Sequence, residues 1–233
     1  MLLISPGLAW AAEEGEGEGR YFSPSQNSHF DYYLIPPAAE VKGIFIYMHG
    51  AGGGHEQGLS DSNFAATFKR LKETLNKAGL LYVCPATAGF GRDGGENLRE
   101  LAHELTRQYQ VPIYLAGASA GTHNVARAIQ GEELFAGAIL ISPTLRARDM
   151  ARPVTIPLFV THARQDQFIP LARISALVAG LKERGARVEF LPVRGHHDSP
   201  LEKMDWARSL TYLTTKDAPP QTVAAASFAG QPR

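Results

Sequence analysis

The sequence predicts an α/β protein with a doubly wound, mostly parallel sheet. Apolar, β-branched runs of strand length alternate with amphipathic segments of helix length along most of the 233 residues. The strand-length runs are continuously hydrophobic, which is typical of strands buried on both faces of a parallel sheet. Because no repeat or internal linker interrupts the alternation, we expect a single domain over residues 21–216.

The expected strands are the runs of apolar residues that are too short for helices. Six of them should form the centre of the sheet: 42–49, 80–85, 111–117, 137–142, 157–163 and 188–193. An earlier run, "YYLIP" at 32–36, is expected to add an edge strand. Reactive groups in such sheets collect in the loops that follow the carboxyl ends of the strands.

The expected helices are recognised by apolar residues at helical spacing. Residues 62–79 place Phe64, Phe68, Leu71 and Leu75 on one face, with Gly79 as the stop. Three further helices are expected. The helix expected at 96–110 has an apolar stripe of Leu98, Leu101 and Leu105. The helix expected at 171–185 has a similar stripe of Leu171, Ile174 and Leu181. The last helix should run from about 200 to 214.

Composition excludes several functional classes. Lys plus Arg equals Asp plus Glu at 23 each, so no charge excess points to nucleic acid or to an anionic membrane. No apolar run is long enough to span a bilayer. The single cysteine, Cys84, lies in an apolar run, which favours a buried structural thiol over a nucleophile.

The two ends of the chain differ from the domain between them. Residues 1–20 are interpreted as an export signal whose front is missing, or as a loose N-terminus, because "AWA" resembles a cleavage site but no basic start precedes it. The first interpretation predicts a periplasmic or secreted protein, and the second a cytoplasmic one. Residues 217–233 show no apolar period and are expected to be a disordered tail.

The strongest chemical signal is a serine at a predicted strand-to-helix junction. The segment Gly117-Ala118-Ser119-Ala120-Gly121 fits G-x-S-x-G and follows the apolar run at 111–117. A serine on so tight a turn takes a strained backbone conformation, and the residues two before and two after it must be small. The turn would expose the hydroxyl and direct the amide of Ala120 toward the same space, while the start of the helix adds partial positive charge.

A serine hydroxyl needs a base, and the base needs a group that orients it. Asp166 follows one later strand, and Gly195-His196-His197 follows the last strand. The order Ser, Asp, His, each beyond a separate strand, resembles that of the α/β-hydrolase family, and the resemblance covers roughly 31–214. It implies an α/β-hydrolase fold and catalytic roles for Ser119, Asp166 and His196.

Alternatives to two of these residues remain. The family usually places its base directly after a glycine, which selects His196 and leaves His197 to shape the loop or line the rim. Asp149 and Asp198 are the other candidate acids. Asp198 is too close in sequence to the histidine to approach it from behind, and Asp166 has better spacing than Asp149 and is followed closely by Ile-Pro, as family members often are.

A glycine-rich loop after the first central strand completes the resemblance. His49-Gly50-Ala51-Gly52 looks like the family's HG-type loop, whose amide joins that of the residue after the nucleophile. The resemblance therefore implies Ala51 and Ala120 as oxyanion donors, with Gly52 as a further candidate. Each such donor is typically worth about 3 kcal/mol of the barrier. Expected pocket residues are His49, Gly50, Gly52, Phe90, Phe168 and His197.

Two rival motifs are weaker. "GFGRDG" at 89–94 matches a dinucleotide fingerprint, but the next strand ends in "YLAGAS" without the acid that would hold a ribose, so it is interpreted as a loop beside the pocket. A metal site from His162, Asp166, His196 and His197 lacks the tight ligand spacing of H-E-x-x-H. We therefore expect no cofactor and no metal ion.

The predicted reaction is hydrolysis of a carboxylic ester through an acyl-enzyme. Only about 14 residues separate the strands at 137–142 and 157–163, so no cap fits there. An open cleft with Phe90 and Phe168 as apolar walls would suit short-acyl esters or exposed esters of a larger molecule. The same residues could serve an acyltransferase, thioesterase or peptidase, and the fold also occurs as a non-catalytic binding module.

Overall fold

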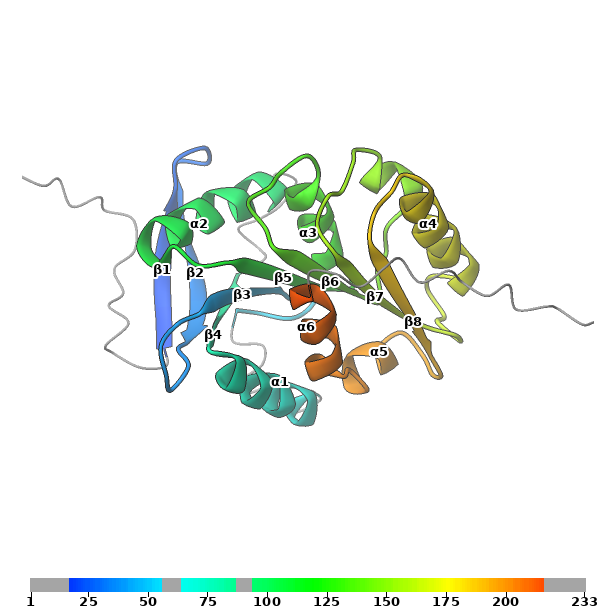
Figure 1. The fold of residues 1–233 in the computed structure, drawn as a ribbon, viewed down its shortest axis with the longest axis horizontal. Helices are drawn as coiled ribbons and strands as arrows, with labels where there is room; N and C mark the ends of the chain where they lie inside the picture. Colours follow the sequence, from blue (N-terminus) through cyan, green and yellow to red (C-terminus); the bar gives the residue numbers. More distant parts are fainter. Residues whose placement is uncertain (1–16, 56–63, 87–93, 216–233) are drawn as a thin grey trace, which may run out of the picture.

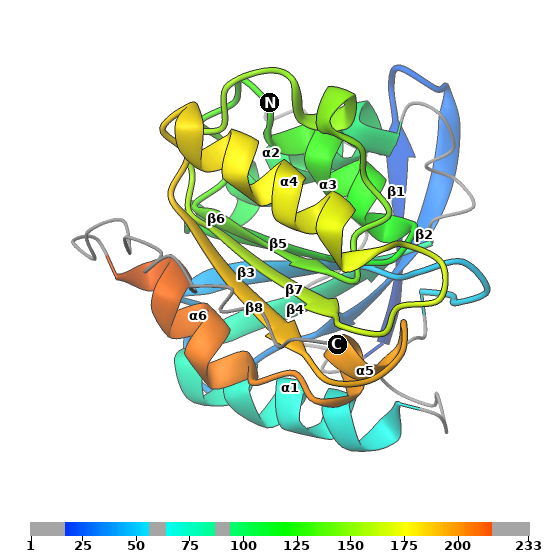
Figure 2. The same ribbon diagram turned by 90° about the vertical axis from the view of Figure 1, so that its right-hand side faces the viewer.

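A computed structural model describes residues 17–55, 64–86 and 94–215. It shows an eight-stranded sheet in the order β1-β2-β4-β3-β5-β6-β7-β8. Helices cover both faces: α2, α3 and α4 lie on one side and α1, α5 and α6 on the other (Figures 1 and 2). The predicted class, a doubly wound and mostly parallel sheet, is confirmed.

The elements have the following bounds. The strands are β1 (Gly17–Ser23), β2 (Ser28–Ile35), β3 (Gly43–Met48), β4 (Leu80–Pro85), β5 (Ile113–Ala118), β6 (Gly137–Ile141), β7 (Leu158–Ala163) and β8 (Val188–Val193). The helices are α1 (Ala65–Ala78), α2 (Gly94–Tyr109), α3 (Gly121–Ile129), α4 (Leu171–Glu183), α5 (Ser199–Glu202) and α6 (Trp206–Thr214), with a 3-10 turn at Ala147–Met150.

The sheet differs from the prediction at one edge. Strands β3 to β8 pair in parallel, as expected, but β2 is not an edge strand, because β1 pairs with it antiparallel on its other side. Residues 17–20, which were grouped with the N-terminal segment in the sequence, belong to β1. Residues 1–16 and 216–233, which include most of the predicted leader and the predicted tail, lie outside the described residues. The polar sequence "GEGRYFS" gave no strand signal because it forms a half-exposed strand.

The predicted helices form with one adjustment. In α1, Phe68, Leu71 and Leu75 are buried, and Gly79 closes the helix with φ 68°. The single helix expected near the C-terminus is divided into two, because α5 ends at Glu202 and α6 starts after Asp205. The side chain of Asp205 caps α6 by accepting the N–H of Arg208.

Two hydrophobic layers hold the sheet. One lies under α2, α3 and α4, and the other lies under α1 and α6. Cys84 is buried in the second layer, as predicted. None of the helices among the described residues has the length and apolar character to cross a membrane.

The chain between β6 and β7 is fully described and contains no inserted domain. Residues 142–157 hold only the 3-10 turn Ala147–Met150. The expectation that no cap covers this part of the sheet is therefore confirmed.

Candidate active site

Ser119 lies between the end of β5 and the start of α3, in the strained conformation expected of a strand-to-helix elbow. Its φ is 48°, in the left-handed region that non-glycine residues rarely adopt. A Cβ on Gly121 would lie 2.2 Å from the carbonyl oxygen of Met48, and one on Gly117 would lie 2.8 Å from that of Gly121. Both glycines are therefore required by backbone packing around the serine.

Several hydrogen bonds hold the backbone of Ser119. Its N–H donates to the carbonyl of Ile141 at the end of β6, at 2.9 Å. Its carbonyl accepts the hydroxyls of Thr122 at 2.5 Å and Thr144 at 3.4 Å. His123 contacts Thr144 through Nε2 at 2.9 Å, so this histidine supports the loop after β6. The elbow is thus fixed from two neighbouring strands, which compensates for its strained φ.

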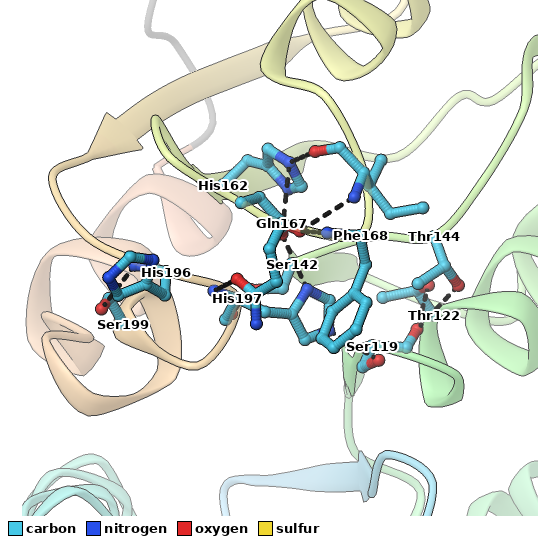
Figure 3. A network of polar contacts seen from close by, with 12 residues as sticks. Ser119, Thr122, Ser142, Thr144, His162, Gln167, Phe168, His196, His197 and Ser199 are labelled. Carbon is cyan, nitrogen blue, oxygen red and sulfur yellow. Dashed lines mark hydrogen bonds and ion pairs between the residues drawn. The ribbon is translucent and has the colours of Figure 1, made fainter.

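The side chain of Ser119 forms a hydrogen-bonded chain with His197 and Asp166. Figure 3 shows Ser119 and His197 next to each other. Ser119 Oγ lies 2.9 Å from His197 Nε2, and His197 Nδ1 lies 2.7 Å from Asp166 Oδ2. Because an ionised carboxylate only accepts hydrogen bonds, we place the proton of the neutral imidazole on Nδ1. Nε2 is then free to accept the serine hydroxyl proton, which is the arrangement of a nucleophile, its base and an orienting acid.

The structure contradicts the choice of His196 as the partner of Ser119. His196 is exposed and lies beside Ser199, away from Ser119, whereas His197 is only 8% exposed (Figure 3). Gly195 turns the chain with φ 126°, and the next N–H, that of His196, donates to Ser199 Oγ at 3.1 Å. The turn therefore directs the first histidine outward and the second toward the sheet.

A network from three loops positions His197. Its N–H donates to Gln167 Oε1 at 3.2 Å, and its carbonyl accepts the hydroxyl of Ser142 at 2.5 Å. Gln165 receives the N–H of Gly195 on its side-chain oxygen at 2.7 Å and donates its own N–H to the Gly195 carbonyl at 3.1 Å. No sequence signal marks Ser142, Gln165 or Gln167, because their role depends on loops that meet only in the folded chain.

Asp166 is held as an ionised, oriented carboxylate. Its side chain has no exposed surface, and Oδ1 accepts the N–H groups of Phe168 at 2.8 Å and Ile169 at 2.9 Å. Burial acts to raise the pKa of Asp166, but the Ile169 N–H, the hydrogen bond to His197 and the Phe168 N–H together hold this pKa below its usual value. The carboxylate is therefore available to accept from His197 at neutral pH.

A second histidine, His162, lies behind the carboxylate. Its Nε2 is 2.9 Å from the Ile169 carbonyl and 3.5 Å from Asp166 Oδ2. Burial lowers the pKa of His162, although the Ile169 carbonyl and the Asp166 charge act against this. His162 is therefore a neutral donor that supports the loop carrying the acid.

The HG-type loop has a defined peptide orientation. Gly50 lies directly beside the serine, since a Cβ there would be 3.3 Å from that of Ser119. The Gly50 carbonyl accepts from His49 Nδ1 at 2.8 Å and from the Gly53 N–H at 3.2 Å. In a trans peptide the next N–H points opposite to this carbonyl, so the Ala51 amide faces away from these donors. Ala120, the other predicted donor, precedes α3, where amides lack helical partners.

Two recesses flank Ser119. The first, of about 300 Å³, is lined by Tyr47, Gly50, Ala51, Phe64, Ala118, Ser119, Thr144, Phe168, His197, Asp198 and Leu201. The second, of about 240 Å³, is lined by His49, Gly50, Ala51, Ala120, Gly121, His123, Asn124 and Arg127. Both share Gly50 and Ala51, so they meet at the HG-type loop.

The predicted pocket residues are distributed unevenly around these recesses. Phe168 is 66% exposed, and its ring stands edge-on to His197 with centroids 5.2 Å apart, so it forms a wall of the first recess. His49 lines the second recess, and Gly52 lines neither. Phe90 and most of "GFGRDG" lie outside the described residues.

The rejected alternatives have other partners. The Asp149 carboxylate accepts the Arg146 N–H at 2.7 Å, while Asp198 lines the first recess from its exposed position before α5. His29 and His103 are exposed. Within residues 17–55, 64–86 and 94–215, no group of three or more His, Cys, Asp or Glu side chains could hold a metal ion.

Comparison with solved structures gives the fold family. An α/β serine hydrolase homologue from Coxiella burnetii superposes with a TM-score of 0.67 and 19% identity, over 87% of this chain and 100% of that one. A Pyrococcus furiosus esterase superposes with a TM-score of 0.69 and 12% identity, over 88% of this chain and 94% of that one. A Staphylococcus aureus S-formylglutathione hydrolase superposes with a TM-score of 0.66 and 13% identity, over 85% of this chain and 98% of that one. Protein-family models and curated proteins gave no match to the sequence. The chain therefore has the α/β-hydrolase fold.

Proposed function

We propose that this chain is a serine hydrolase that cleaves carboxylic esters. The observation that carries the proposal is the chain of hydrogen bonds from Ser119 Oγ through His197 to Asp166, at 2.9 and 2.7 Å. Solved proteins of this fold that match the chain include a serine hydrolase homologue and an esterase, which supports the same chemistry.

The proposed mechanism assigns each group one task. His197 Nε2 takes the proton of Ser119 as Oγ attacks the carbonyl carbon, and Asp166 stabilises the imidazolium that results. The amides of Ala51 and Ala120 stabilise the oxyanion. The imidazolium then protonates the leaving alkoxide, an acyl-enzyme remains, and water attacks it with His197 again acting as base. His197 thus takes the role that the sequence analysis gave to His196.

The shape of the site favours small or exposed esters. The first recess, of about 300 Å³, is at the lower end of the range for ligand pockets. Its apolar lining comes from Tyr47, Phe64, Phe168 and Leu201. The second recess is smaller still, at about 240 Å³. Since neither recess is large and no domain is inserted between β6 and β7 to enclose a long acyl chain, we propose short-acyl esters as substrates.

The proposal is tested with a fluorophosphonate probe and a series of p-nitrophenyl esters of increasing acyl length. We expect the wild-type protein to be labelled at Ser119 and kcat/KM to fall with acyl length. Ser119→Ala should abolish labelling, and His197→Ala should lower kcat by about 10⁴-fold or more. Each variant removes a member of the hydrogen-bonded chain.

His196→Ala is the matched control, because it removes the same type of side chain one residue away, from an exposed position. We expect it to keep kcat within a few-fold of the wild type. A wild-type protein that neither reacts with the probe nor cleaves any ester would favour a binding module. Comparable losses from His196→Ala and His197→Ala would contradict the assignment of the base.

A further inference from the structure

The second recess beside Ser119 contains a feature that the proposed mechanism does not use. Asn124 lies in the second turn of α3 and is 8% exposed. No residue in the described part of the chain hydrogen-bonds its side-chain amide, and the amide is not among the buried polar atoms sealed from solvent. The small accessible part of Asn124 therefore opens onto the recess that it lines.

The other buried or half-buried polar side chains of this helix and of its C-cap have hydrogen-bond partners. Thr122 donates to the Ser119 carbonyl, and His123 contacts Thr144. Gln130, also 8% exposed, donates to the carbonyls of Ala126 and Asp149 at 2.8 and 2.9 Å. Burying an amide without a partner is unfavourable, so a buried amide that faces a recess next to a reactive serine indicates a ligand contact.

The positions of the two recesses decide which part of a substrate would reach Asn124. His197 must give its proton to the leaving group, and it lines the first recess only. The leaving group therefore lies in the first recess. The second recess, which is reached past Gly50 and Ala51, is left for the acyl part.

The chemistry of an asparagine side chain defines the group that it would bind. Its amide carries donors and an acceptor, and another amide can satisfy both at once. A carboxylate would leave the Asn124 oxygen without a donor, and an alkyl group would leave the whole side chain unpaired. Resting on the proposed ester hydrolysis, we propose that Asn124 is a specificity-determining residue that hydrogen-bonds an amide on the acyl part of the substrate.

The test compares esters that share an ethanol leaving group and differ only at the end of the acyl chain. Ethyl succinamate, ethyl 4-methylpentanoate and monoethyl succinate end in an amide, its apolar isostere and a carboxylate. Homologues with one more methylene in the acyl chain test whether Asn124 lies deeper in the second recess than these three esters reach. We expect wild-type kcat/KM, measured from released ethanol, to be at least about ten-fold higher for the amide than for the isostere, which corresponds to about 1.4 kcal/mol.

Asn124→Leu should remove this preference and leave the Tm unchanged or raised, because it replaces an unpaired buried amide with an apolar group of similar shape. Gln130→Leu is the matched control. It removes a buried amide of the same helix that is satisfied, so it should lower the Tm while the preference stays.

The outcomes separate this proposal from the proposed function. A wild-type protein that cleaves all three esters with equal kcat/KM, or a variant that keeps the amide preference, overturns the role of Asn124 alone. A drop in Tm for Asn124→Leu like that of Gln130→Leu would show a structural amide and overturn it too. Preference for the carboxylate would overturn the amide assignment in favour of an anion. Absence of any ester cleavage and of fluorophosphonate labelling overturns the proposed hydrolase function.

Discussion

Asp166 uses its two carboxylate oxygens differently. Oδ1 accepts the N–H groups of Phe168 and Ile169, and Oδ2 accepts His197 Nδ1. Two backbone donors therefore fix which oxygen faces the imidazole. The role of Asp166 depends on this orientation as well as on its charge.

This orientation makes Asp166→Asn informative. The two backbone N–H groups will select the amide oxygen of the asparagine, so its NH₂ must face His197 Nδ1. The imidazole is then held with its proton on Nε2, where it cannot accept from Ser119, and we expect kcat to fall by about 10⁴-fold with little loss of stability. Kinetics on a short p-nitrophenyl ester, together with thermal unfolding, measure both effects.

Asp149→Asn is the matched control, because Asp149 was another candidate acid and its carboxylate accepts a backbone N–H of its own turn. We expect kcat to change less than about three-fold for this variant. A strong loss with Asp149→Asn and none with Asp166→Asn would mean that the acid has been assigned to the wrong loop.

At the residue scale, the sequence predicted that Ser119 and Asp166 lie at one site, but it selected His196, whereas His197 is the histidine that contacts both in the structure. Which of two adjacent histidines faces the sheet depends on the φ of Gly195 and on the Ser199 hydroxyl that receives the next N–H. Neither has a local sequence signal. Asn124 was not singled out for a related reason, since an asparagine in a helix is ordinary until the described part of the structure shows no hydrogen-bond partner for its amide.

At the scale of elements, the junction of β5 and α3 is the most constrained part of the fold. α3 packs so closely on the end of β3 that a Cβ on Gly121 would lie 2.2 Å from the Met48 carbonyl oxygen and 2.6 Å from that of His49. These are backbone atoms, which cannot rotate away. The junction that carries Ser119 and the loop that carries Ala51 are thus in direct backbone contact.

Gly121→Ala should therefore damage stability and activity together. We expect it to lower the free energy of unfolding by roughly 1–3 kcal/mol, as overpacking typically does, and to reduce kcat by displacing Ser119 relative to the HG-type loop. Gly180→Ala, inside α4, is the control with the opposite sign. Its Cβ would approach only the end of Arg184 at 3.4 Å, so it should stabilise by roughly 0.5–1 kcal/mol.

Urea unfolding and ester kinetics on the two glycine variants check this prediction. Stabilisation by Gly121→Ala, or unchanged activity in that variant, would contradict the close contact between α3 and β3. Destabilisation by Gly180→Ala would instead show that α4 does not have regular helical geometry at that position.

The elements that the sequence predicted are those with strong hydrophobic patterns. Strands β3 to β8 are apolar runs, and their positions agree with the expected segments within two residues. Strand β1 was missed because Gly17–Ser23 alternates exposed and buried residues and is stabilised by pairing with β2. The break between α5 and α6 was missed because it depends on the side chain of Asp205 capping the second helix.

For the whole molecule, buried titratable groups determine the response to acid. Burial lowers the pKa values of His49, His123 and His162. The Asp149 charge opposes this shift in His123. The Ile169 carbonyl and the Asp166 charge oppose it in His162. The unfolded chain therefore binds protons on these histidines at a higher pH than the folded chain does. By linkage, protonation then favours unfolding as the pH falls below about 6.5, the ordinary pKa of histidine.

The free energy of unfolding should accordingly be constant above about pH 7.5 and decrease below about pH 6.5. Each histidine contributes a slope of at most about 1.4 kcal/mol per pH unit.

Asp166 acts in the same direction at lower pH. Its depressed pKa stabilises the fold above about pH 3.9, and this contribution is lost as the pH falls through the folded-state pKa. Urea unfolding at pH 8, 6.5, 5.5 and 4.5 measures the part due to the histidines, and further points at pH 3.5 and 2.5 measure the part due to Asp166. His162→Gln, which keeps a donor for the Ile169 carbonyl but cannot titrate, should unfold with a smaller slope between pH 6.5 and 5.5. An unfolding free energy that stays level from pH 8 to pH 5 would show that these histidines take up protons without unfolding, and hence that they are not held neutral by burial.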